Sequence, residues 1–174
     1  MTDHFIIKNA TISDISVILS FIKELAAYEK LSHEVVVTEE ILKETLFGEK
    51  AYAEVLIGYL NNVPVSIAIF FHNFSTFLGR PGIYLEDLFV KPEARGKRIG
   101  QKMLAYLAQL AKERKCGRLE WWVLDWNESA INFYKKIGAK AMDEWTVYRV
   151  TGEALDNLAS SNCGALDAKN KSQR

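Results

Sequence analysis

The residues best suited to chemistry lie between Glu86 and Lys102, where two acids in an apolar segment precede a basic loop that contains glycine. The cations and glycines of this stretch are Lys91, Arg95, Gly96, Lys97, Arg98, Gly100 and Lys102. A strand that runs into such a loop and then into a helix can bind an anion, because backbone N–H groups and the helix dipole both face it. Basic side chains add charge-assisted hydrogen bonds. The alternative is a solvated helix start, which is the commoner use of a charge run.

The loop does not match the familiar nucleotide-binding motifs. Neither G-x-x-x-x-G-K-[ST] nor G-x-G-x-x-G occurs in this stretch. If it binds a pyrophosphate, the loop is therefore of a different kind.

The two acids before the loop, Glu86 and Asp87, are neighbours in an expected strand. Successive strand residues face opposite sides, so at most one of them points into a given site unless a bulge intervenes. The alternative for either acid is a structural pair with a nearby arginine.

The apolar pattern predicts the elements that must position these residues. Alternating or continuous apolar segments predict strands at 5–7, 55–59, 63–71, 83–90, 119–124 and 145–150. A capping box at Thr11 and Asp14 precedes a helix that runs to about Tyr28, and a second helix lies between Thr38 and Gly48. Further helices are predicted at 98–115, 129–137 and 151–158. This order indicates one α/β domain with an antiparallel hairpin early and a strand–helix–strand–helix centre.

The composition and net charge of the chain exclude several classes of function. The 174 residues contain 22 Lys and Arg against 22 Asp and Glu, a net charge of zero, whereas duplex-DNA binders usually show a basic excess. The 49% of hydrophobic residues indicate a globular chain. Two cysteines exclude a disulfide scaffold and fit a reducing compartment. No apolar segment resembles a signal peptide or a membrane span. We therefore expect a cytoplasmic protein with no nucleic-acid or membrane partner.

The segment Arg95-Gly96-Lys97-Arg98-Ile99-Gly100 resembles the Q/R-x-x-G-x-G/A motif of the GNAT N-acetyltransferases. Segments 84–90, 125–134 and 138–139 resemble the other signature blocks of that family, in the same order. The sequence is most similar to the diamine (spermidine/spermine) and thialysine N-acetyltransferases. The resemblance covers residues 4–158, which implies a single GNAT domain. From Gly152 onward the sequence has no aromatic or β-branched residue, so we expect a flexible C-terminal tail at 159–174.

The resemblance implies an α/β GNAT fold, which is a mixed, mostly antiparallel twisted sheet flanked by helices with a central strand–loop–helix site for acetyl-CoA. It implies an enzyme that moves the acetyl group of acetyl-CoA to a primary amine of a small cationic substrate, such as a diamine, a polyamine or thialysine. The amine would attack directly, through a tetrahedral intermediate and without a metal. The resemblance also implies a homodimer, with residues 145–150 as the expected contact. The alternatives are a protein or peptide N-acetyltransferase and a non-catalytic acyl-CoA-binding module.

Two residues would carry the proton transfers. An alkylamine with a pKa of about 10.4 is almost fully protonated near neutral pH, so a base must take a proton before attack. The resemblance assigns that base, or an amine-binding carboxylate, to Glu86. It assigns the general acid to Tyr134, whose phenol can protonate the leaving thiolate. The structural alternative for Tyr134 is a packed aromatic on an amphipathic helix.

The resemblance also assigns the binding residues. Those expected to bind the cofactor are Leu88, Phe89, Val90, Arg95, Gly96, Lys97, Arg98, Ile99, Gly100, Gln101, Asn127, Glu128, Ser129, Ala130 and Tyr134. Residues 88–90 would act through backbone groups that polarise the thioester carbonyl. Those expected to bind the amine are Tyr28, Glu29, Glu86 and Asp87. Arg98 stands where the family usually has glycine. We expect it to adopt a negative, helical φ, since a positive φ would cost about 1 kcal/mol or more.

Overall fold

The computed structural model describes residues 3–161, and the chain divides into two compact units, Met1–Leu124 and Asp125–Arg174. The first unit contains a five-stranded sheet with the strand order β1-β2-β3-β4-β5. The strands are β1 (Phe5–Asn9), β2 (Glu54–Leu60), β3 (Val63–Ser75), β4 (Arg80–Val90) and β5 (Leu119–Trp121). Neighbours are antiparallel except β4 and β5, which are parallel. The predicted mixed, mostly antiparallel sheet is confirmed.

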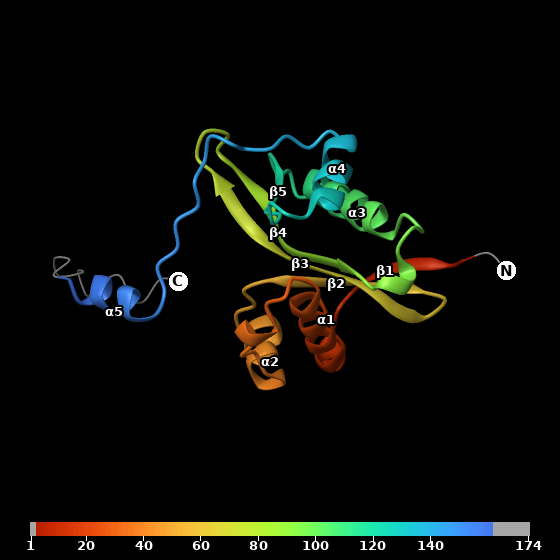
Figure 1. Cartoon of the computed structure of the whole chain (residues 1–174), viewed down its shortest axis with the longest axis horizontal. Helices are drawn as coiled ribbons and strands as arrows, with labels where there is room; N and C mark the ends of the chain where they lie inside the picture. Colours follow the sequence, from red (N-terminus) through yellow and green to blue (C-terminus); the bar gives the residue numbers. More distant parts are fainter. Residues whose placement is uncertain (1–2, 162–174) are drawn as a thin grey trace. The chain divides into compact units, whose positions relative to one another are not determined.

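Helices cover both faces of this sheet. Helices α1 (Ile15–Tyr28) and α2 (Glu39–Phe47) lie against one face, and α3 (Ile99–Glu113) lies against the other (Figure 1). Met103 and Leu107 of α3 are fully buried, in agreement with the helical spacing of apolar residues in the sequence. Among residues 3–161, none of the helices has the length and the apolar character that crossing a bilayer would require.

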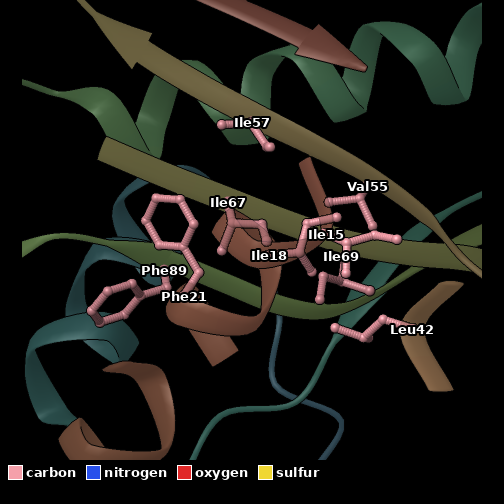
Figure 2. Packing of buried hydrophobic residues seen from close by; sticks show 9 residues of the cluster. All are labelled: Ile15, Ile18, Phe21, Leu42, Val55, Ile57, Ile67, Ile69 and Phe89. Carbon is pink, nitrogen blue, oxygen red and sulfur yellow. The ribbon is translucent and has the colours of Figure 1, made fainter. Parts of the chain in front are cut away.

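The core between α1 and the sheet fixes one end of the strand that carries the two acids. Figure 2 shows its buried members, which are Ile15, Ile18, Phe21, Leu42, Val55, Ile57, Ile67, Ile69 and Phe89. The rings of Phe21 and Phe89 meet edge to face, with their centroids 6.3 Å apart, a preferred geometry for aromatic pairs. This packing holds α1 against the end of β4.

Side-chain caps begin the first two helices where the sequence predicts them. The Thr11 N–H donates to Asp14 Oδ2 over 2.8 Å in the capping box that leads into α1. The Ile41 N–H donates to Thr38 Oγ1 over 3.3 Å at the start of α2. Such bonds satisfy backbone donors that the helix itself leaves without a partner.

The second unit contains α4 (Glu128–Lys136) and α5 (Gly152–Ser160). The predicted strand at 145–150 is wrong, since these residues are in neither strand nor helix. Trp145 and Tyr148 are 71% and 90% exposed. A strand requires a partner that completes its hydrogen bonds, and the described residues of this unit provide none for this segment.

The fifth strand is shorter than predicted for the same reason. It ends at Trp121 instead of residue 124, because only 119–121 pair with β4. The predicted helices at 98–115 and 129–137 are present as α3 and α4 with slightly different ends. Helix α5 extends to Ser160, and residues 162–174 of the expected tail lie outside the described residues.

Candidate active site

Strand β4 loses its neighbour β5 partway along its length. The parallel pairing ends at Leu85 and Trp121, whereas β4 continues to Val90 and stays paired with β3. From Glu86 onward, one edge of β4 has no partner strand in the described part of the chain. Backbone N–H and C=O groups on such an edge are open to a ligand. Residues 88–90, which are predicted to bind the cofactor through their backbone groups, lie on this edge.

A β-bulge interrupts the pairing of β3 with β4 at Glu86. Phe70 is opposite Leu85, whereas its neighbour Ile69 is opposite Asp87, so Glu86 is the extra residue. Directly paired residues share a face of the sheet, and Ile69 belongs to the core on the α1 side. Asp87 therefore lies on the α1 face, although Leu85, two residues earlier, lies on the other. The bulge reverses the alternation that would have placed Asp87 beside α3.

The carboxyl group of Asp87 is mostly withdrawn from water and lies among other acids. Burial, together with the negative charges of Glu86 and Glu29, raises its pKa to about 6. The pKa of Glu29 is also raised, by burial alone. Glu86 itself is exposed. The three carboxylates thus form a locally negative region, with Asp87 as its most buried member.

A pocket of about 280 Å³ opens beside these acids. Its apolar walls come from α1 and the segment that follows it, through Ile22, Leu25, Ala26, Leu31, Val35, Val36 and Val37. Three acids line it as well, namely Glu29, Glu34 and Asp87. Sequence reasoning predicted Glu29 and Asp87 but not Glu34, which lies between a short polar turn and three valines and which no periodic pattern distinguishes. Apolar walls with a few acids suit an aliphatic chain that carries a cation.

The predicted amine-binding residue Tyr28 ends α1 and lies 38% exposed against β4. Its ring centroid is 6.5 Å from that of Phe89. The guanidinium carbon of Arg95 lies 4.6 Å from the Tyr28 centroid and 5.9 Å from that of Phe89. The Arg95 Nε–H also donates to the Val90 carbonyl oxygen over 3.1 Å. Arg95, predicted to bind the cofactor, therefore contacts residues of both predicted binding sites.

The basic loop makes a sharp turn into α3, and the expectation of a negative φ at Arg98 is wrong. Arg98 has a φ of +58°, in the left-handed region, and Gly96 has a φ of +79°. Arg95 is extended, and Ile99 already begins the helix. Two left-handed residues make this change of direction within a few residues. A left-handed conformation costs a residue other than glycine about 1 kcal/mol or more.

This turn leaves the start of α3 accessible to an anion. The Arg98 side chain does not cap the helix, so it leaves the first N–H groups of α3 available. A Cβ added to Gly96 would meet no atom within 4 Å, and one added to Gly100 would meet only Val90 Cγ2 at 3.8 Å. Lys97 forms an ion pair with Asp3 at 2.9 Å. Uncapped N–H groups, open space and positive charge fit a pyrophosphate.

The remaining predicted cofactor residues belong to the second unit. The Asn127 side chain accepts a hydrogen bond from the Ala130 N–H over 3.3 Å and caps α4, where Glu128 and Ser129 form the first turn. Tyr134 follows one turn later, with its ring centroid 5.6 Å from that of Phe133. The structure thus gathers the loop, the acids and Tyr28 in one unit and Tyr134 in the other. Joint action of Tyr134 with Glu86 stays a prediction.

Comparison with known proteins gives concordant matches. Residues 21–139 match the acetyltransferase (GNAT) family. A thialysine N-epsilon-acetyltransferase from Bos taurus is 39% identical over 164 residues, which are 88% of this chain and 96% of the relative. An L-ornithine N5-acetyltransferase from Arabidopsis thaliana is 30% identical over 201 aligned positions, covering 90% and 88% of the two chains. An integron cassette protein from the mobile metagenome of V. cholerae has a solved structure with a TM-score of 0.76 and 30% identity, covering 90% of this chain and 98% of that one.

Proposed function

Because the chain belongs to the GNAT acetyltransferase family, we propose that it transfers the acetyl group of acetyl-CoA to a primary amine of a small cationic substrate. One observation carries the proposal. Asp87 lies on the open edge of β4, where the thioester would be held, and also lines the acidic pocket, where an ammonium group would bind. A single strand would therefore bring the two reactants together.

The residues of the first unit fit acetyl-CoA. The start of α3 and its loop would bind the pyrophosphate, and backbone groups of residues 88–90 would bind the pantetheine arm. The bound thioester supplies the acetyl group. A backbone N–H aimed at its carbonyl oxygen would stabilise the negative charge that develops during attack.

Acidic residues would prepare the amine. We propose that Glu86 and Asp87 bind the ammonium group and accept its proton, directly or through water, so that the neutral amine can attack. The bulge supports this arrangement, because it lets consecutive acids serve one side of the strand. Tyr134 would then protonate the leaving thiolate.

The proposed substrate is a diamine or a basic amino acid whose side chain ends in an amine. Thialysine and ornithine, named for two relatives, both belong to this class. In this chain, the apolar pocket walls would contact the aliphatic stem, while Glu29 and Glu34 would attract a second cation. A peptide N-acetyltransferase, the other candidate, would not require a second cation.

A substrate panel tests this proposal through the release of free CoA. 1,5-Diaminopentane should exceed pentylamine in kcat/KM by about 10-fold at low salt, and the difference should shrink as salt screens the acids. Glu29→Gln should reduce that preference, whereas Glu49→Gln, outside the pocket, should not. Equal kcat/KM for the two amines would contradict the cationic-substrate proposal. No CoA release with any amine would contradict the proposal that the protein is an acetyltransferase.

We also propose that the protein is a cytoplasmic homodimer. The low cysteine count supports the location. The exposed apolar side chains at 145–150 support the association, because such a segment is stabilised when a partner covers it.

A further inference from the structure

The contact of Arg95 with Tyr28 and Phe89 has the form of a cation bound by aromatic rings. The guanidinium lies within 6 Å of both ring centroids, the range in which a cation is attracted to an aromatic face. The Arg95 side chain is exposed and comes from a loop, not from the core. Arg95 of the chain itself therefore supplies the cation that contacts these rings, and a cationic ligand can replace it.

Each proposed substrate requires a group that Arg95 now holds. The amine, which is predicted to bind at Tyr28, would use the ring that the guanidinium covers. The pantetheine arm requires the backbone at the end of β4, where the Val90 carbonyl already accepts a hydrogen bond from Arg95 Nε. Glu29, an acid of the pocket and the neighbour of Tyr28 in the chain, would attract the guanidinium as well as the amine, which favours this position as long as neither ligand is bound.

We propose that Arg95 is a gate shared by the two substrates: it occupies the cation site on Tyr28 and the Val90 carbonyl in the free enzyme, and it leaves both when either substrate binds. The inference rests on the proposed function, since it takes the amine and acetyl-CoA as the ligands. The pyrophosphate supplies a second partner for the guanidinium. Gly96, next in the chain, has a φ of +79° and no atom within 4 Å of an added Cβ, which leaves room for the loop to adjust.

The Arg95 gate makes the two substrates cooperative. The first ligand to bind has to displace Arg95, and the second does not. Binding of one substrate therefore strengthens binding of the other by the same factor, because coupling between two sites is reciprocal. We expect a factor of about 5-fold or more, since typical coupling between sites begins near that value.

Calorimetric titration tests the gate without turnover, with CoA, which carries no acetyl group, and 1,5-diaminopentane as the probes. In the unmodified protein, saturating CoA should lower the Kd of the diamine about 5-fold or more. In Arg95→Ala, the diamine should bind the free protein as tightly as it binds the unmodified protein saturated with CoA, and the coupling should vanish. Lys97→Ala is the matched control from the same loop. It should weaken CoA binding but leave the Kd of the diamine for the free protein unchanged.

A second variant keeps the test valid if Arg95→Ala fails to fold. Tyr28→Leu removes the aromatic face and leaves Arg95 in place, so CoA alone should bind about 2-fold tighter or more, because the guanidinium is released more easily. A purely structural contact would not tighten CoA binding. Both ligands binding without coupling, or coupling that survives Arg95→Ala, would overturn the gate while leaving the proposed function intact. Failure of CoA to bind the unmodified protein would overturn both.

Discussion

At the scale of single residues, Asp87, which we propose binds the amine, lowers the stability of the fold when it is ionised. Its pKa is raised from 3.8 to about 6 by burial and by the charges of Glu86 and Glu29. The unfolded chain ionises this group at a lower pH than the folded chain does. Asp87 therefore stabilises the fold most at low pH, and that contribution is lost as the pH rises through about 6. Such a loss of stability is common at residues that serve binding, the role that we propose for Asp87.

The Asp87→Asn variant tests the effect of Asp87 on stability separately from its proposed effect on activity. Above pH 7 the variant should be more stable than the unmodified protein, by about 1–3 kcal/mol, because the neutral amide avoids burying a charge. Near pH 4 the two stabilities should converge. Urea unfolding at both pH values measures this, and Glu34→Gln, an exposed acid of the same pocket, should show little change. Equal stability of Asp87→Asn and the unmodified protein above pH 7 would contradict the raised pKa.

The activity of Asp87→Asn should change in the opposite direction. If the ionised carboxylate binds the ammonium group, kcat/KM of the unmodified protein should rise with pH through about 6, where Asp87 ionises. In the variant this rise should disappear, and kcat/KM near pH 7.5 should fall about 10-fold or more. A pH profile that retains the same inflection in the variant would assign it to another group.

We predict that Tyr134 protonates the leaving thiolate. Tyr134→Phe removes one hydroxyl and keeps the ring that contacts Phe133. We expect kcat to fall about 100-fold with little change in CoA affinity, as when a positioned proton donor is lost. Phe133→Leu is the control, because it alters the packing but keeps the phenol. An unchanged kcat in Tyr134→Phe, with chemistry rate-limiting, would make Tyr134 a packing residue.

At the scale of elements, the sequence predicts the helices and strands that have one face buried in the core. The capped helices α1 and α2 and the strands β1 to β4 agree with the periodic pattern, since buried faces fix that pattern. The bulge at Glu86 was not predictable, because it depends on how β3 and β4 pair rather than on either strand alone. The short β5 and the absent strand at 145–150 have the same origin, since a strand forms only where a partner pairs with it.

The loop before α3 contains a residue whose backbone conformation lowers the stability of the protein. Arg98 holds a φ of +58°, so Arg98→Gly should stabilise the protein by about 1 kcal/mol through relief of the left-handed strain, reduced by the greater freedom of glycine in the unfolded chain. Chemical denaturation measures the change. Lys97→Gly, the neighbouring position, has no positive φ and should destabilise the protein. Destabilisation by Arg98→Gly would mean that the Arg98 side chain contributes more than the strain costs.

At the scale of the whole molecule, the candidate catalytic residues are divided between the two compact units. The loop, the acids and Tyr28 lie in Met1–Leu124, and Tyr134 lies in Asp125–Arg174. The sequence predicts the first group by chemistry and by resemblance. In the structure, that unit contains an open strand edge, an acidic pocket and an uncapped helix start. The role of Tyr134 rests on the family resemblance, because a tyrosine on an amphipathic helix has the same pattern whether it packs or reacts.

The apolar segment at 145–150 leads to a prediction about the assembly. Trp145, Val147 and Tyr148 are 71%, 54% and 90% exposed, and the segment is in neither strand nor helix. An alternating apolar segment of this kind is stabilised when it pairs with another chain. Light scattering should therefore give twice the chain mass of 19.8 kDa at micromolar concentration.

Val147→Asp and Tyr148→Asp should shift the protein toward the monomer, whereas Phe77→Asp, at an exposed ring in the turn between β3 and β4, should not. A mass near that of one chain at all concentrations would contradict the dimer. A dimer that persists in both aspartate variants would place the contact on another surface.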